Sequence, residues 1–374
     1  MRRTITGLLT ALLTIGIANA ASERGIRSVK LDRSSLNVAA GETRTLTVDY
    51  AAAGVSTVTV LDRDGYAVRA LANGQPVHGG SIALSWNGRD DSGQLVADEA
   101  YSFKIDWRGA TAHDLYFPAG VQQPMRTIDV RSYDRRSATL SYALPQPSRV
   151  HVQAGTAVLD PKSKQLVGPV MKTIVNREPR AAGLIAEHWS GYDESGAIFI
   201  PSLENFVVAI AATPLPENSI ITFGNRQRRF VDTLSTRHGA SLLAGTAQHV
   251  HHGGLQTEDD ISPSLKIEPL NAVWSNADHR WITKGEDALR LRLAVQGPTA
   301  AAFRTHPATI ELFIDGRRIG EPSRKRGDTV AISLPDQRGE HRVSVNWNSD
   351  WGPVAANTIE IRVPARDAPA GGSR

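Results

Sequence analysis

The chain has 374 residues, with 42 Lys and Arg against 38 Asp and Glu, and it contains no cysteine. The missing cysteine excludes a disulfide scaffold, a cysteine nucleophile, thiolate zinc or iron–sulfur sites and covalent c-type haem. A hydrophobic fraction of 41% is typical of a globular protein and too small for a membrane protein. The length suggests several domains, at about 100 to 200 residues each.

The first twenty residues have the order of a cleavable signal peptide. Arg2 and Arg3 precede an apolar run from Leu8 to Ile17, and small residues follow at Ala18-Asn19-Ala20. The run is shorter than the roughly 20 residues that span a bilayer. We therefore expect an exported mature protein in the periplasm, outside the cell or at its surface. Loss of Arg2 and Arg3 lowers a formal charge of only +4, so a nucleic-acid partner is not expected.

The mature chain has the alternating pattern of β-strands throughout. Apolar residues recur at every second position between turns rich in Gly, Pro, Asn and Asp, and period two places them on one face of a strand. The pattern is clear at Ile82, Leu84 and Trp86, and again at Tyr101, Phe103, Ile105 and Trp107. One apolar and one polar face per strand predicts antiparallel sheets packed as sandwiches.

An internal repeat divides the first part of the chain. The pattern W-x-G-x-D-acid-S-G begins at Trp86 and returns at Trp189. A spacing of this size is too long for a solenoid repeat and fits tandem sandwich domains. The residues that define the motif are Trp86, Gly88, Asp90 and Gly93 in the first copy and Trp189, Gly191, Asp193 and Gly196 in the second.

The motif predicts a strand, a turn bounded by glycines and a returning strand. Trp86 ends an apolar strand face, so its indole is expected to seal one end of a small sandwich. Gly88 and Gly93 can adopt positive φ, and Asp90 can accept hydrogen bonds from the backbone of the turn. Clustered carboxylates at Asp62-Arg63-Asp64 and Asp90-Asp91 also raise the alternative of calcium, but neither has the spacing of a calcium loop.

The run from Val58 to Leu71, the motif at Trp86 and the strand from Tyr101 to Ile105 together resemble the immunoglobulin-like (Ig-like) domain of the flagellar hook-capping protein, the FlgD type. Residues 40–107 carry the resemblance, although Glu99-Ala100 stands where that family usually has a glycine before the tyrosine. Residues 138–212 resemble it with a longer central insert. The resemblance implies an Ig-like fold in an exported, non-catalytic protein.

A third strand-rich segment has the generic pattern of bacterial Ig-like modules, with an Asp315-Gly316 turn between strands. The expected fold is therefore all-β, with three tandem Ig-like antiparallel β-sandwich domains after the signal peptide. The expected division is 1–20 signal peptide, 21–128 first FlgD-type domain, 129–224 second FlgD-type domain, 225–263 linker containing His and Gly, 264–364 third Ig-like domain and 365–374 disordered tail.

The linker contains the candidate metal ligands His249, His251 and His252. In an extended segment His249 and His251 point the same way and could bind zinc or copper, or a haem supplied by another protein. The alternative is a polar, glycine-rich linker without a bound group. No cofactor is otherwise expected.

Catalytic motifs are missing from the sequence: it has no G-x-S-x-G, no H-E-x-x-H and no phosphate-binding loop. The expected function is therefore structural: a non-catalytic exported protein, without a transmembrane segment, that docks or scaffolds another envelope or extracellular protein. Two alternatives remain. One is an accessory subunit of a surface metal or haem redox complex that uses the histidines. The other is a carbohydrate-binding or carbohydrate-active protein, suggested by Trp347 and Trp351 as an aromatic platform.

Overall fold

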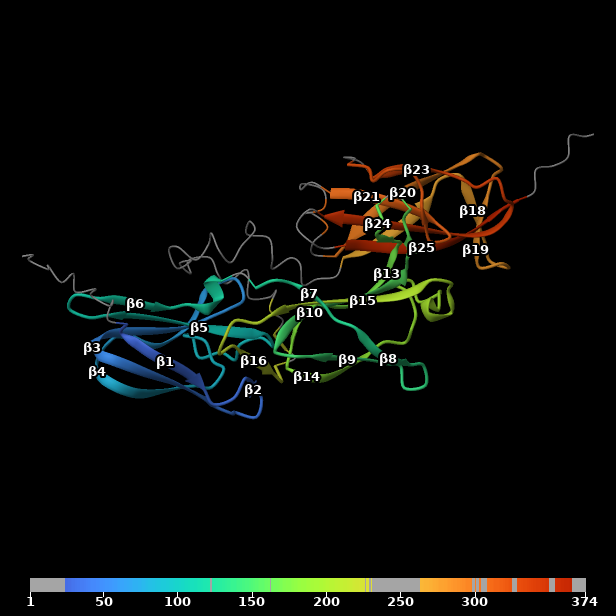
Figure 1. Ribbon diagram of the computed structural model, residues 1–374. Coiled ribbons are helices and arrows are strands. Elements are labelled where there is room, and N and C mark those ends of the chain that lie inside the picture. Colours follow the sequence, from blue (N-terminus) through green and yellow to red (C-terminus); the bar gives the residue numbers. More distant parts are fainter. Residues whose placement is uncertain are drawn as a thin grey trace, which may run out of the picture.

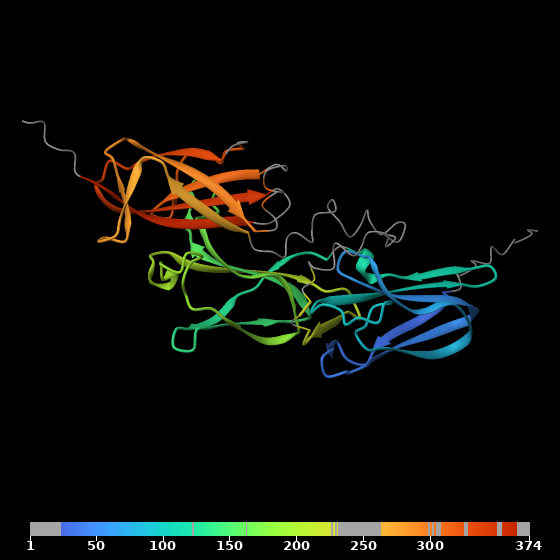
Figure 2. The same cartoon turned by 180° about the vertical axis from the view of Figure 1, so that it is seen from behind.

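The computed structural model describes residues 24–230 and 263–364, apart from short gaps at 122, 162, 226, 229, 298–299, 301–302, 304–307, 325–327 and 350–353. Three β-modules follow one another along the chain, and they are coloured blue to teal, green to yellow, and orange to red in Figures 1 and 2. Each has its own buried core, and the middle module holds two adjoining clusters. The all-β prediction is confirmed.

The first module is built around two long strands that run through both layers of the sandwich. β3 pairs with β1 through its first half and with β5 through its second half, and β4 follows β3 along most of its length. Leu46, Val48 and Tyr50 are buried at alternate positions of β3, as period two requires. The strands are β1 (Ile26–Leu31), β2 (Ser35–Asn37), β3 (Arg44–Leu61), β4 (Ala67–Trp86), β5 (Ala100–Arg108) and β6 (His113–Tyr116).

The sheet of the first module is completed by a strand from much later in the sequence. β16 (Ile220–Phe223) pairs antiparallel with the beginning of β5, at Ala100 and Tyr101, and parallel with β2. β6 pairs with the other end of β5. Ile220 is fully buried in the core of the first module. The expected division places 220–223 in the second domain, whereas the structure places this strand in the first.

Residues that follow β16 continue along the first module. The backbone N–H groups of Gly224 and Asn225 donate to the Asp98 carboxylate, at 3.0 and 2.8 Å. Arg228 donates to Asp90 and to the backbone of Leu95. Asn225 and Arg228, at the start of the expected linker, are therefore bound to the first module, and the second module is inserted between two segments of the first.

The second module is a sandwich of a four-stranded and a three-stranded sheet. The strand orders are β13-β10-β15-β7 and β14-β9-β8, and β11 and β12 form a separate hairpin. Short 3₁₀ helices precede and interrupt the module, η1 (Pro118–Gly120) and η2 (Ile200–Ser202). The strands are β7 (Arg126–Thr127), β8 (Val130–Asp134), β9 (Thr139–Leu144), β10 (Ser148–Thr156), β11 (Val158–Leu159), β12 (Leu166–Val167), β13 (Val170–Arg180), β14 (Gly183–His188) and β15 (Phe206–Pro214).

The third module is a sheet curled around its own apolar core. Its main strand order is β22-β21-β24-β25-β17-β20-β23, and the β18–β19 hairpin joins through β19 to β25. The alternating residues Leu289, Leu291 and Leu293 of β20 are all buried. The strands are β17 (Ser264–Pro269), β18 (Ala272–Ser275), β19 (Arg280–Thr283), β20 (Ala288–Gln296), β21 (Ala308–Ile314), β22 (Arg317–Arg318), β23 (Thr329–Ser333), β24 (Gly339–Ser349) and β25 (Val354–Val363).

The second and third modules touch where β13 approaches β24. The carboxamide of the buried Asn346 pairs with the backbone N–H and C=O of Val170, at 2.8 and 3.1 Å. Arg318 lies 3.6 Å from Asp160, which follows β11. The carboxamide satisfies two backbone groups at the edge of β13 that a neighbouring strand would otherwise bind.

Candidate functional site

The two copies of the repeated motif have the same local geometry. The indole of Trp86 is 2% exposed and that of Trp189 is 3% exposed. Each indole N–H donates to the carbonyl three residues later, that of Arg89 at 2.9 Å and that of Tyr192 at 3.0 Å. This bond lets a large ring be buried without leaving its donor unpaired. The tryptophans therefore have a structural role in both modules.

The aspartates of the motif bind the backbone of their own turns. The Asp90 carboxylate accepts from the N–H groups of Ser92 and Gln94, at 3.0 and 2.9 Å. Asp193 accepts in the same way from Ala197 and Ile198, at 3.0 Å each. The motif glycines Gly88, Gly93, Gly191 and Gly196 all have positive φ. These carboxylate oxygens act as turn acceptors, which is the chemistry expected of an Asx turn.

The histidine cluster of the linker, His249, His251 and His252, lies outside the described residues. Within the ranges that the structure describes, no group of three or more His, Cys, Asp or Glu side chains is placed to hold a metal ion. The structure therefore does not test the prediction that these histidines bind a metal ion or a haem.

The aromatic platform raised as an alternative for a sugar would need both Trp347 and Trp351 at the surface, whereas the other interpretation places one of them in the core. Trp347 is 6% exposed and packs edge-on against Phe303 in the core of the third module. Trp351 lies outside the described residues. A buried indole cannot stack on a ligand from solvent, so Trp347 serves the core.

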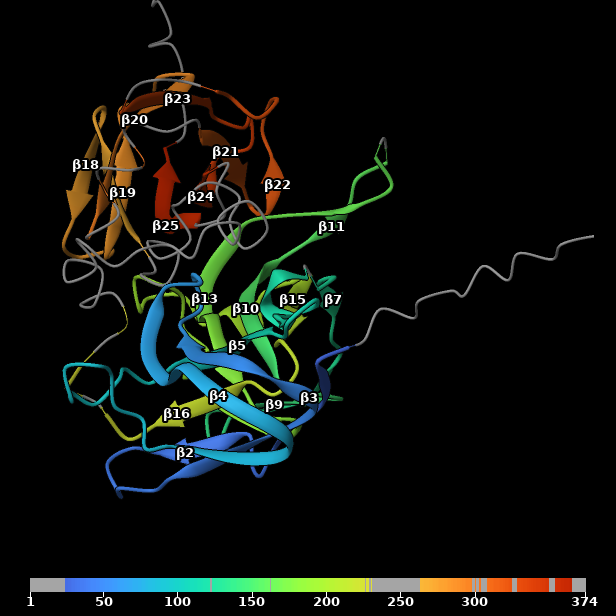
Figure 3. The ribbon, with the colours of Figure 1, turned by 90° about the vertical axis from the view of Figure 1, so that its left-hand side faces the viewer.

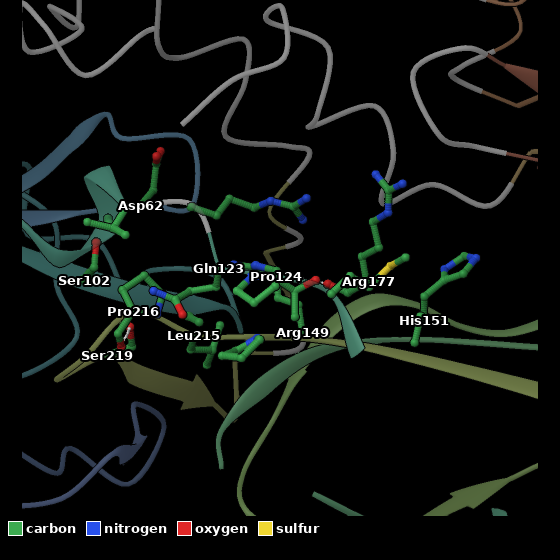
Figure 4. A pocket seen from close by; sticks show the side chains of 18 residues that line it. Asp62, Ser102, Gln123, Pro124, Arg149, His151, Arg177, Leu215, Pro216 and Ser219 are labelled. Atoms are coloured by element: carbon green, nitrogen blue, oxygen red, sulfur yellow. Dashed lines mark hydrogen bonds between the residues drawn. The ribbon is translucent and has the colours of Figure 1, made fainter. Parts of the chain in front are cut away.

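A concave site lies between the first two modules. It has a volume of about 670 Å³ and is bordered by the end of β3, by β10 and β13, and by the two segments that connect the modules. Figure 4 shows Asp62 and Ser102 toward one end and His151 toward the other. Val121 and Met125, on the first connecting segment, are 62% and 71% exposed. We call this site the inter-module groove.

A buried ion-pair network lies beside the inter-module groove and crosses the module boundary. Glu99 Oε1 lies 2.7 Å from Arg149 Nη2 of the second module, and Glu99 Oε2 lies 3.4 Å from Arg63 Nη1 of the first. The Glu99 side chain is only 4% exposed. The N–H of Ala100 also donates to Glu99 Oε1, and the N–H of Glu99 donates to the hydroxyl of Thr222 in β16.

Charge and burial oppose each other at Glu99. Burial raises the pKa of its carboxyl group, but the guanidinium groups of Arg149 and Arg63 outweigh burial and hold that pKa below its ordinary value. Glu99 is therefore ionised at neutral pH. A buried carboxylate of this kind is tolerable only while its cationic partners remain in place.

Arg177 reaches the inter-module groove because β13 carries a β-bulge. In the register with β10, Val150 faces Glu178 and His151 faces Asn176, so Arg177 is the extra residue. Its φ of 55° lies in the left-handed region that side-chain-bearing residues rarely adopt. Bulges re-aim side chains in this way next to functional sites. Its carbonyl accepts from Arg149 Nη1 at 3.3 Å.

His151 is neutral at physiological pH. Burial and the neighbouring charge of Arg177 lower the pKa of its imidazole to about 4. Figure 4 shows His151 and Arg177 projecting from the same side of the sheet. Asp62 is the carboxylate among the described lining residues, so these lack the paired carboxylates that acid–base catalysis uses.

Comparison with known families now identifies the class of the first module. Residues 34–110 match the FlgD Ig-like domain family. The resemblance of this part of the first module to that family is thereby confirmed. No curated protein matches the sequence. No helix among the described residues is long and apolar enough to cross a membrane.

Several solved structures are similar to this chain over most of its length. The fibronectin(III)-like modules of CbhA from Clostridium thermocellum share 10% identity, with 90% of this chain and 94% of that chain covered and a TM-score of 0.21. The FN1–FN3 domains of chicken CNTN1 share 9% identity, with 92% and 99% covered and a TM-score of 0.19. A 1.5-MDa bacterial ice-binding adhesin shares 11%, with 91% and 100% covered and a TM-score of 0.17.

Proposed function

We propose that this is a non-catalytic exported protein that docks or scaffolds a partner protein at the cell envelope or outside the cell through its Ig-like modules. The observation that carries the proposal is the pairing of β16 with β5 and β2. Because the chain leaves the first module and returns to it, two connections join the first two modules. A doubly connected pair resists the hinge motion that a single linker permits.

The Glu99 network supports the same conclusion. Arg149 and Glu99 belong to different modules, and separation of the modules would leave a desolvated carboxylate with one guanidinium fewer. The cost of such a loss is high in a low-dielectric environment. A fixed angle between modules benefits a protein that presents a docking surface or spaces two partners. The proposed docking surface is the inter-module groove.

Partner capture tests the proposal. Tagged mature protein is recovered from native envelopes by affinity, and each captured protein is then purified and titrated against the bait by calorimetry. Arg177→Ala serves as the matched variant, because Arg177 lines the groove on a bulge and not in the core. We expect one saturable partner whose affinity the variant weakens. Failure of every captured protein to bind the purified bait would overturn the proposed function.

Export is tested separately. If the signal peptide is cleaved after Ala20, the first residue of the mature protein is Ala21. N-terminal sequencing of the protein from the periplasm and from the culture medium distinguishes the two proposed locations. Recovery of full-length protein in the cytoplasm alone would contradict export.

A further inference from the structure

The β18–β19 hairpin of the third module presents an uncharged outer strand. β18 pairs with β19, and no strand among the described residues pairs with its other edge. Figures 1 and 3 show β18 on the outside of the module. The sequence from Leu270 to Ala277 contains no charged residue. Outer strands usually carry charges, proline or bulges that discourage pairing with another chain.

The hydrogen bonds of the hairpin show which backbone groups of β18 face outward. The N–H of Lys284 donates to the carbonyl of Asn271, and the same register continues through Val273 opposite Ile282. Hydrogen-bonded and non-hydrogen-bonded pairs alternate in an antiparallel ladder. Val273 therefore directs its N–H and C=O toward β19, whereas Ala272 and Trp274 direct theirs away from the hairpin.

Two side chains of this strand are apolar and exposed, and one of them is held in place by its neighbours. Val273 is 57% exposed and Trp274 is 45% exposed. The Trp274 ring packs edge-on against Trp281, with 5.5 Å between ring centroids, and its indole N–H donates to Asn276 Oδ1 at 2.9 Å. A tryptophan fixed by its neighbours loses little conformational freedom on binding, and exposed tryptophans are frequent interface anchors.

We propose that β18 pairs antiparallel with β18 of a second copy of this chain and forms a two-fold symmetric dimer. In this arrangement the outward-facing backbone N–H and C=O of Ala272 form hydrogen bonds with those of Trp274 in the second copy. By symmetry, the same groups of Trp274 bind those of Ala272 in the second copy. Val273 then faces Val273 of the second copy as a non-hydrogen-bonded pair, in which side chains approach closely. The two hairpins join into one continuous four-stranded sheet.

The second copy fits this edge because the edge is complementary to itself. An isologous contact brings a strand against the same strand, so any charge at its centre meets the same charge. β1 carries Arg27 and Lys30, and β22 consists of Arg317 and Arg318, so each would meet like charges if it paired with its own copy. The run centred on Val273 has no such penalty. The inference does not depend on which partner the first two modules bind.

The chain lacks cysteine, and this permits a direct test by cross-linking. Val273→Cys places the new thiols opposite each other at the centre of the proposed interface. Leu115→Cys is the matched control, because Leu115 is similarly exposed, at 47%, on β6 of the first module. Under a mild oxidant we expect Val273→Cys to form a covalent dimer well before the control. Equal rates for the two variants would overturn the proposal.

Sedimentation equilibrium of the cysteine-free protein provides the second measurement. We expect dimerisation that increases with concentration, and we expect Val273→Lys to weaken it by about tenfold or more because two ammonium groups are then placed face to face. Val273→Thr keeps the β-branched shape and should dimerise nearly as well. A monomer at every concentration would contradict this inference while leaving partner capture by the first two modules intact.

Discussion

Arg149 of the second module and Glu99 of the first form an ion pair across the module boundary, with Nη2 2.7 Å from Oε1. Glu99 occupies the place where the FlgD-type pattern usually has a glycine. A buried carboxylate at this position is stable only when cationic groups lie beside it. The guanidinium groups of Arg63 and Arg149 are those cationic groups. Glu99 thus links the first module to the second.

Removal of the Glu99 carboxylate should destabilise the first two modules strongly. Glu99→Ala removes the buried carboxylate that pairs with Arg149 and Arg63, and loss of one partner of a buried ion pair costs about 3 to 5 kcal/mol of unfolding free energy. Urea unfolding of the mature protein measures the change. Glu268→Ala is the control, because its partner Arg292 lies 3.6 Å away in an exposed pair that contributes about 0 to 1 kcal/mol. Equal effects of the two variants would contradict this assignment.

Acid should weaken the second module through His151. Its imidazole has a pKa of about 4 in the folded protein, against an ordinary value of 6.5, so the unfolded chain binds the proton more readily. The His151 contribution to stability is therefore complete above pH 6.5 and falls as the pH drops toward 4. Glu99 adds a loss only below its ordinary pKa of 4.5, because its pKa is lowered on folding.

Hydrogen exchange of peptides from β10, measured across this pH range, tests the His151 prediction. His151→Gln should reduce the acid sensitivity between pH 6.5 and 4.5, where the Glu99 contribution is still complete. The same titration followed by NMR gives the imidazole pKa directly. A pKa near 6.5 in the folded protein would show that His151 is exposed to water.

The repeated turns were visible in the sequence because the hydrogen bonds that shape each turn are local. Trp86, Asp90 and Gly93 each form a hydrogen bond with a residue only a few positions away, so the spacing of these residues predicts the turn. The return of β16 to the first module was not visible, because Ile220 meets Tyr101 across an intervening module. Glu99 was the available sign, since a charge at a glycine position requires a partner elsewhere. The exposure of Trp274 could not be predicted, because the alternation of residues in a strand does not show whether that strand lies at the edge of a sheet.

The first module should depend on a residue that lies beyond the second. Ile220→Ala removes a fully buried side chain from the core of the first module, and such a change costs about 2 to 5 kcal/mol. Hydrogen exchange should therefore increase in β5, far from the substitution in sequence. Phe223→Ala serves as the control, because Phe223 is 46% exposed on the same strand. If hydrogen exchange in β5 were unchanged in the Ile220 variant, β16 would not contribute to the stability of the first module.

The two motif tryptophans should each stabilise their own module. Trp86→Ala and Trp189→Ala remove buried rings, at about 3 to 5 kcal/mol each, which is a large share of the about 5 to 15 kcal/mol available to a domain. Exchange should rise in the first module for one variant and in the second for the other. Trp274→Ala, at a half-exposed ring, should have a smaller effect. Shifts of a degree or two in the thermal melt of the motif variants would argue against their role in the core.

The third module should detach from the second when Asn346 loses its carboxamide. Asn346→Ala leaves the N–H and C=O of Val170 without the partner that binds them at 2.8 and 3.1 Å, and an unsatisfied buried polar group costs about 1 to 3 kcal/mol. Asn348→Ala is the matched control on the same strand, because Asn348 donates to Glu311 within the third module, at 2.8 Å. Small-angle X-ray scattering should show a wider range of module separations for Asn346→Ala than for the control. The Arg318 to Asp160 ion pair, at 3.6 Å and with both side chains half-buried, is left unchanged in both variants. Identical scattering from both variants would mean that the modules are held by other contacts.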